Sequence, residues 1–212
     1  MHGKPLVYLD SAASAQKPAQ VLDALMSAYQ DTYANVHRGL HFLSEASTDL
    51  YEAVRNKVAG FIGAASGDEI VLTSGATMSL NLIARCWAQP RLQPGDEILI
   101  SIAEHHANIV PWQMVAEATG ARVRAFTLED DGAFSMARLK AGMSERTRII
   151  SVPHVSNVLG TVFPVAEIAE LAHDAGALMV VDGCQGVVHM PVDVTTLGAD
   201  SVSYTHLTLP TT

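Results

Sequence analysis

Short apolar runs alternate with amphipathic segments along most of the chain. Turn residues bound four segments predicted as strands: 97–101, 122–126, 148–152 and 178–181. The last is a short apolar run, which is typical of a strand buried on both faces. Apolar residues at helical spacing fill the segments between these strands, and a further strand is predicted at 69–73. Strands that alternate with helices of about ten residues predict an α/β fold, a mainly parallel sheet flanked by helices.

The composition is that of a globular protein with a substantial core. Of the 212 residues, 49% are hydrophobic and 17% are charged. The net charge of −9 argues against nucleic acid or an anionic membrane as a partner. No apolar run is long enough to span a membrane, and the N-terminus lacks the apolar core of a signal peptide. Cys86 and Cys184 form no metal-binding pattern, so we expect a reduced cytoplasmic setting and no metal site.

The strand predicted at 178–181 ends in an acidic residue, Asp182, which Gln185 follows closely. Open α/β sheets bind their ligands at the carboxyl ends of the strands, where this carboxylate would lie. A carboxylate beside a pyridine nitrogen keeps that nitrogen protonated, because an opposite charge favours the charged form. The alternative for Asp182 is a cap of the following turn, and the alternative for Gln185 is a solvated loop amide.

A loop of small residues at 73–77 leads into a predicted helix. Small side chains such as Ala76 leave backbone N–H groups accessible, the helix start is partly positive, and Thr77 adds a hydroxyl. These features suit a phosphate group. An ordinary helix N-cap is the alternative.

Two further loops follow predicted strands. In the loop at 104–108, His105 is suited to lie on an aromatic cofactor and to exchange protons, with a metal site or a structural role as alternatives. In the loop at 154–160, Asn157 offers a donor and an acceptor to a carboxylate or a phenolic oxygen, with an Asx turn as the alternative. Together the four loops carry the groups that a pyridoxal phosphate site needs.

Five motifs between Tyr8 and Asp200 carry a family resemblance: YLDSAASAQKP, NVHRG, EHHANIVPWQM, HVSNVLGT and VDGCQGVVHMPVDV. Together they resemble the cysteine desulfurase and selenocysteine lyase family of the SUF-associated type. That family belongs to the class V aminotransferases, which depend on pyridoxal phosphate.

The resemblance implies a role for particular residues. His105 would stack on the cofactor ring and transfer protons, Asp182 would pair with the pyridinium, and Gln185 would contact the phenolic oxygen. The implied cofactor contacts are Ala76, Thr77, His105, Asn157, Asp182 and Gln185, and the implied substrate contacts are Ala12, Ala13, His37, Arg38 and Asn157.

The resemblance also implies an architecture and a reaction. The architecture is a fold-type I large domain with a C-terminal small domain, assembled as a homodimer. The reaction converts L-cysteine, or L-selenocysteine, into L-alanine. The enzyme holds the sulfur as a persulfide and passes it to an acceptor protein of an iron–sulfur assembly system.

The end of the sequence departs from the family pattern. Residues 1–200 are expected to form an incomplete large domain, truncated before the small domain, and residues 201–212 an unrelated, artefactual tail. The family continues into Ser-Gly-His-Lys, whose lysine forms the Schiff base, whereas here no lysine follows Lys140. The nucleophilic cysteine of the family is missing as well, and Cys184 stands where a small residue is usual. We therefore expect the chain alone to be inactive.

Two alternative functions stay open at this point. Another class V reaction, epimerase-like or kynureninase-like, would use the same cofactor contacts without sulfur chemistry. A non-catalytic module that dimerises with a full-length copy is the other.

Overall fold

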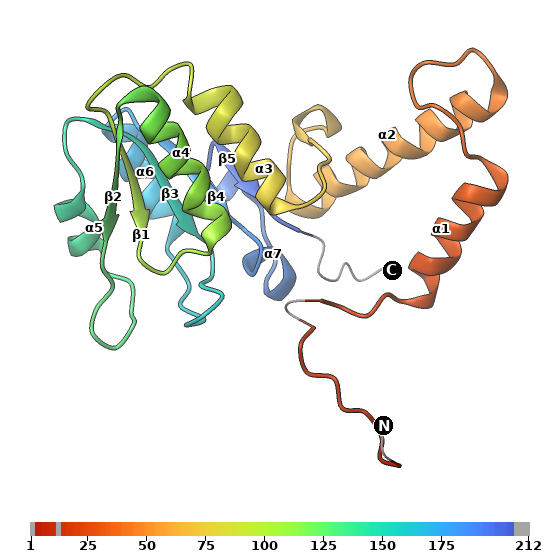
Figure 1. Ribbon diagram of the computed structural model, residues 1–212, viewed down its shortest axis with the longest axis horizontal. Coiled ribbons are helices and arrows are strands. Elements are labelled where there is room, and N and C mark those ends of the chain that lie inside the picture. The colour runs from red at the N-terminus through yellow and green to blue at the C-terminus, as the bar shows by residue number, and fades with distance from the viewer. Residues whose placement is uncertain (1–2, 12–13, 206–212) are drawn as a thin grey trace.

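The computed structural model describes residues 3–11 and 14–205, and the statements below refer to these residues. Five parallel strands form one sheet in the order β2–β1–β3–β4–β5 (Figure 1). Their bounds are β1 Glu97–Ser101, β2 Arg122–Phe126, β3 Thr147–Pro153, β4 Leu178–Asp182 and β5 Ser201–Ser203. The predicted α/β fold with a mainly parallel sheet is confirmed.

The helices mostly fall where the apolar spacing predicts them. Their bounds are α1 Ala19–Asp31, α2 Phe42–Ile62, α3 Ala76–Leu82, α4 Val110–Thr119, α5 Met136–Gly142, α6 Val165–Asp174, α7 Gly186–His189 and α8 Val194–Leu197. Short 3-10 turns lie at Gly67–Glu69 and His106–Asn108, and a π-helical turn, Ile83–Ala88, extends α3.

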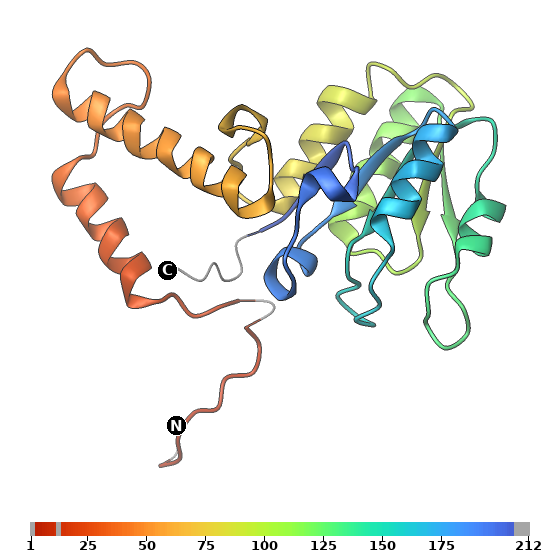
Figure 2. The same cartoon turned by 180° about the vertical axis from the view of Figure 1, so that it is seen from behind.

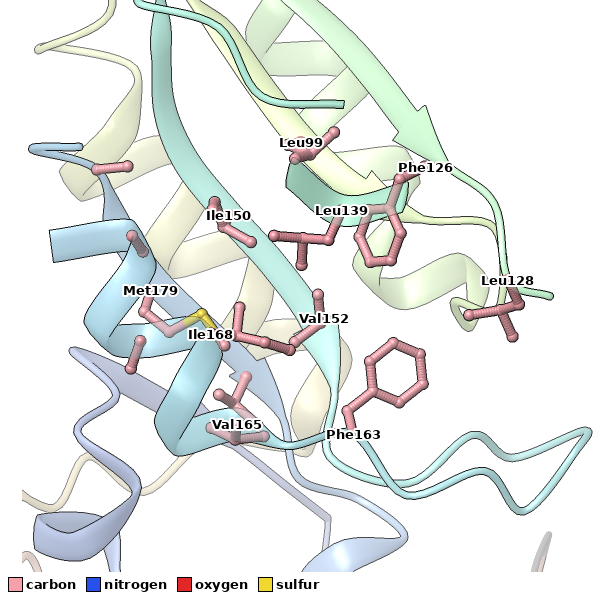
Figure 3. Close-up of a cluster of buried hydrophobic side chains, with 14 residues drawn as sticks. Leu99, Phe126, Leu128, Leu139, Ile150, Val152, Phe163, Val165, Ile168 and Met179 are labelled. Atoms are coloured by element: carbon pink, nitrogen blue, oxygen red, sulfur yellow. The ribbon is translucent and has the colours of Figure 1, made fainter. Parts of the chain in front are cut away.

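Helices cover both faces of the sheet, and successive strand residues point to opposite faces. In β4, Met179 and Val181 pack into the cluster beneath α5 and α6, whereas Val180 packs into the cluster beneath α3 and α4. Figure 3 shows the first cluster, in which Ile168 of α6 lies beside Met179 and Leu139 of α5 lies beside Phe126. The strand predicted as buried on both faces is therefore buried as expected.

The predicted strand at 69–73 is wrong. Its first residue, Glu69, ends the turn Gly67–Glu69, and the residues that follow pair with no strand of the described chain. Ile70 has extended backbone, with φ −98° and ψ 119°, so the local preference is realised without a partner. A cavity of about 590 Å³ separates this segment from the end of β5. A strand needs a neighbour within hydrogen-bonding reach, and here the nearest edge lies across that cavity.

The first two helices extend away from the sheet (Figures 1 and 2). No residue of α1 is buried, although its apolar residues recur at helical spacing. The large apolar side chains that α1 and α2 expose include Leu22, Leu25, Met26, Tyr29, Leu50, Val54 and Phe61. Within the described residues, no helix is long and apolar enough to cross a membrane.

Candidate functional site

The loops predicted to carry chemistry meet at the carboxyl edge of the sheet. β1 has β2 on one side and β3 on the other, so the strand order reverses between β1 and β3. Open α/β sheets bind ligands in the crevice at such a reversal. Next along the sheet, Asp182 at the end of β4 lies opposite Pro153 of β3 and Ser203 of β5.

A cavity of about 450 Å³ lies at this edge, a volume in the range of small-molecule and cofactor sites. All six residues predicted to contact the cofactor line it: Ala76, Thr77, His105, Asn157, Asp182 and Gln185. They come from four separate loops and strand ends, so the fold, rather than proximity in sequence, brings them together.

Asp182 is the buried acid of the cavity, with 6% of its surface exposed. Its Oδ1 accepts the Cys184 N–H at 3.0 Å, which fixes the carboxylate at the strand end. The close approach of the next loop depends on Gly186, where a Cβ would lie 2.4 Å from Nδ1 of His154. This packing leaves the Asp182 carboxylate facing the cavity, where a cationic ring nitrogen would compensate for its charge.

Cys184 also lines the cavity, beside Asp182. Burial, together with the negative charge of Asp182, raises the pKa of the Cys184 thiol to about 12. The thiol therefore stays protonated at neutral pH, and the thiolate is the nucleophilic form. Cys184 is therefore poorly suited to act as a sulfur-accepting nucleophile.

His105 stands at the start of the short turn that precedes α4. Its Nδ1 accepts the Ala107 N–H at 3.1 Å. A nitrogen that accepts a backbone N–H carries no proton of its own, so the ring proton sits on Nε2. The side chain is exposed and lines the cavity, and the backbone contact fixes the ring orientation.

The predicted phosphate loop takes an unusual backbone path. Gly75 has φ 144° and precedes the first helical residue, Ala76. The Ala76 N–H donates to Oγ1 of Thr205 at 2.8 Å, so a hydroxyl oxygen occupies the position of a bound acceptor at this helix start. Sequence reasoning missed Thr205, because 129 positions separate the two residues.

The remaining predicted residues divide between the cavity and a region away from it. Oε1 of Gln185 accepts a hydrogen bond from Nε2 of His189 at 3.2 Å, and Asn157 is exposed in the turn after β3. His37 and Arg38 lie in the turn between α1 and α2, at the end of α2 away from the sheet (Figure 2). They do not line the cavity. Ala12 and Ala13 lie outside the described residues.

No group of three or more histidine, cysteine, aspartate or glutamate side chains within the described ranges is arranged to hold a metal ion. The rings of the adjacent histidines His105 and His106 instead lie with centroids 6.0 Å apart and an angle of 68° between their planes.

Glu104 is a partly buried acid that the sequence reasoning left without a role. Ser101 Oγ donates to its Oε1 at 3.1 Å, and Asn108 Nδ2 donates to its Oε2 at 2.8 Å. Burial raises the pKa of the Glu104 carboxyl from 4.5 to about 8, against those two hydrogen bonds and with a smaller contribution from Asp182. The group is therefore protonated over a range in which an exposed glutamate is charged.

This raised pKa predicts a pH dependence of stability. Between pH 4.5 and 8 the folded state holds a proton on Glu104 that the unfolded state releases, so the free energy of unfolding falls as pH rises through this window. Glu104→Gln removes the titration and should flatten that fall. Urea unfolding of both proteins from pH 4 to 9 measures it. Parallel curves for the two would contradict the prediction, since other titrating groups, such as His154, are common to both.

Comparison with known proteins gives consistent results. Residues 7–205 match the profile of the family described as Aminotransferase class-V. A probable cysteine desulfurase of Synechocystis sp. is 51% identical over 200 residues, covering 94% of this chain and 48% of that protein. The crystal structure of the cysteine desulfurase CsdA from Escherichia coli has a TM-score of 0.84 at 44% identity, over 93% of this chain and 49% of that one. A structure of SspA in complex with cysteine has a TM-score of 0.85 at 27% identity, over 93% of this chain and 56% of that one.

The chain spans about half the length of the curated relatives that it matches. Within that half, the family profile covers nearly every described residue, and the resemblance inferred from the five motifs is confirmed. Class V aminotransferases are enzymes that depend on pyridoxal phosphate, the cofactor predicted from the cavity residues. The chain belongs to the class V aminotransferase family.

Proposed function

We propose that this chain supplies the cofactor site of a pyridoxal phosphate-dependent cysteine desulfurase. The observation that carries the proposal is the convergence of all six predicted cofactor contacts on one cavity at the carboxyl edge of the sheet. The named relatives favour sulfur chemistry over an epimerase-like or kynureninase-like reaction, since they are called cysteine desulfurases at about 50% identity.

The donor set fits the cofactor group by group. When bound, pyridoxal phosphate supplies an electron sink for bonds broken beside the substrate nitrogen. Asp182 would hold a proton on the pyridine nitrogen, because its buried carboxylate favours the cationic ring. The His105 imidazole would cover one ring face, and Gln185 would reach the phenolic oxygen. The backbone at Ala76 and Thr77 would bind the phosphate.

The substrate proposed for the whole enzyme is L-cysteine, converted into L-alanine with sulfur retained as a protein persulfide. The complex of the structural relative SspA with cysteine supports this choice. Asn157 lines the cavity and would contact the substrate. L-selenocysteine is a second substrate of the same chemistry. Because no lysine follows Lys140 and Cys184 is protonated, we propose that the chain by itself does not turn over cysteine.

The partners and setting are also proposals. The apolar side chains that α1 and α2 expose suit burial against a second subunit, which supports a homodimer in which His37 and Arg38 approach the site of the partner subunit. We place the protein in the cytoplasm, where both of its cysteines stay free thiols. The persulfide sulfur would pass to an acceptor protein of an iron–sulfur assembly system.

A chimeric enzyme tests the desulfurase proposal. Residues 1–200 of this chain are joined to the C-terminal half of the Escherichia coli cysteine desulfurase CsdA. The purified protein is given pyridoxal phosphate and L-cysteine. We expect L-alanine, quantified by mass spectrometry, from the chimera and none from the 212-residue chain alone.

The controls separate assembly from chemistry. The visible absorption of bound cofactor shows whether the chimera has assembled its site, and an Asp182→Asn chimera should lose alanine formation. A chimera that binds cofactor yet forms no alanine would contradict the desulfurase proposal. Alanine formed by the 212-residue chain alone would contradict the proposed inactivity.

A further inference from the structure

One carboxyl group, that of Glu104, accepts hydrogen bonds from both ends of the loop that carries His105. Glu104 accepts from Ser101, the last residue of β1, and from Asn108, the residue that ends the short turn before α4. The two bonds use both carboxyl oxygens. The segment between Ser101 and Asn108, which includes His105, is therefore fastened to the strand and to the helix start through Glu104.

The orientation of the Asn108 amide is fixed independently. Its Oδ1 accepts the indole N–H of Trp112 at 2.9 Å and the hydroxyl of Ser151 at 2.7 Å. Both donors point at one atom, so that atom is the amide oxygen and the NH2 group must face Glu104. Ser151 belongs to β3 and Trp112 to α4, and Asn108, Ser151 and Trp112 are fully buried or nearly so. This network anchors Glu104 to two elements beyond its own loop.

The direction of the Ser101 hydroxyl proton is determined in the same way. Its oxygen accepts the Ala103 N–H at 3.1 Å, which leaves the hydroxyl proton for Glu104. Further along the loop, the Ala107 N–H holds Nδ1 of His105. The bonds from Ser101 to Ala107 thus define the direction in which the imidazole faces the cavity. Glu104 itself is not one of the residues that line the cavity.

We propose that Glu104 is a positioning residue that sets the place and the ring tautomer of His105 at the cofactor cavity. The inference rests on the proposed function, in which the imidazole covers the cofactor ring. A side chain that must lie flat on a ring needs its backbone and rotamer held by a supporting shell of hydrogen bonds. The carboxyl supplies that support from the side of the loop away from the ligand.

Two substitutions separate the contribution of the hydrogen bonds from that of the charge. Glu104→Gln keeps an oxygen for Asn108 and can turn its NH2 group to the Ser101 oxygen, so it preserves the loop. Glu104→Ala removes both bonds. Glu117→Ala, at an exposed position of α4, is the matched control.

The first readout is the nitrogen-15 spectrum of the His105 ring in the ligand-free chain, which distinguishes the tautomers directly. The second is the affinity for pyridoxine 5′-phosphate, a cofactor analogue whose alcohol group cannot react with lysines. We expect the wild type, Glu104→Gln and Glu117→Ala to share one tautomer and to differ in affinity by no more than about twofold. Glu104→Ala should mix the tautomers and bind about tenfold more weakly, the cost of a lost hydrogen bond to a buried group.

Each outcome of these measurements either supports or overturns the positioning role of Glu104. An unchanged His105 spectrum and affinity in Glu104→Ala would overturn the positioning role. If Glu104→Ala does not fold, Ser101→Ala removes one of the two bonds, and the absence of any change in tautomer or affinity would overturn the role as well. A tautomer change in Glu104→Ala without binding by the wild type would support the positioning role and count against the proposed function instead.

Discussion

Asp182→Asn should weaken the binding of pyridoxine 5′-phosphate by at least about 100-fold, or about 3 kcal/mol, the cost of breaking a buried charge pair. The amide is isosteric and its Oδ1 can still accept the Cys184 N–H, so the strand end should keep its conformation. What disappears is the negative charge that keeps the ring nitrogen protonated. Calorimetric titration gives the affinity, and the ultraviolet absorption of the bound ligand against pH gives the protonation state of the ring.

Asp174→Asn, at an exposed position at the end of α6, serves as the control and should bind as the wild type does. An Asp182→Asn protein that binds the ligand in its protonated form with unchanged affinity would contradict the assignment of Asp182 to the ring nitrogen. The same substitution bears on Glu104, because Asp182 contributes to the raised pKa of that carboxyl. Because the Asp182 charge opposes ionisation of Glu104, the pH-dependent loss of stability should move to a lower pH in Asp182→Asn.

The direction in which the Glu104 pKa shifts follows from electrostatics. A neighbouring carboxylate disfavours a second negative charge, so removing the Asp182 charge makes Glu104 easier to ionise and lowers its pKa. The pH range over which the free energy of unfolding falls should therefore end at a lower pH in Asp182→Asn. Comparing the unfolding free energies of the two proteins at each pH measures this shift.

The sequence predicts those parts of the fold that depend on local pattern. The bounds of β1 and β2 agree with the prediction residue for residue, because turn residues such as Gly95 and Gly120 stand shortly before each strand. The segment at 69–73 fails for the complementary reason. Its extended preference is local, but pairing needs a partner strand that the described residues do not place beside it. The π-helical turn Ile83–Ala88 has no signal in the apolar spacing.

Some residues of the candidate site can likewise be predicted from the sequence, and others cannot. Asp182 and His105 can be predicted because Asp182 ends β4 and His105 lies in the loop after β1, and the topology of a parallel sheet gathers such positions at one edge. Thr205 cannot be, because its contact with Ala76 joins residues 129 positions apart. Glu104 bonds to near neighbours, Ser101 and Asn108, but the desolvation that raises its pKa arises only in the folded chain. The Asn108 amide, which orients Glu104, is itself fixed by a serine 43 positions away.

The second large expected effect is on stability, and it comes from replacing Asn108. Asn108→Ala should lower the free energy of unfolding by about 3–5 kcal/mol, because it leaves the Trp112 indole N–H and the Ser151 hydroxyl buried without their acceptor. It also removes the donor to Glu104. Urea unfolding followed by circular dichroism measures the loss, and Gln113→Ala, at an exposed position of α4, should change stability by less than about 0.5 kcal/mol.

Two further variants assign the cost to particular bonds. Adding Trp112→Phe removes one orphaned donor, so its cost should be smaller beside Asn108→Ala than in the wild type, as a double-mutant cycle would show. Asn108→Asp keeps an oxygen for Trp112 and Ser151 but sets a carboxylate against Glu104, so its destabilisation should grow as pH rises and Glu104 ionises. Additive costs in the cycle, together with a pH-independent Asn108→Asp, would show that the network does not act as a unit. A coupled cycle would instead show that Asn108 and Trp112 stabilise the protein as a unit.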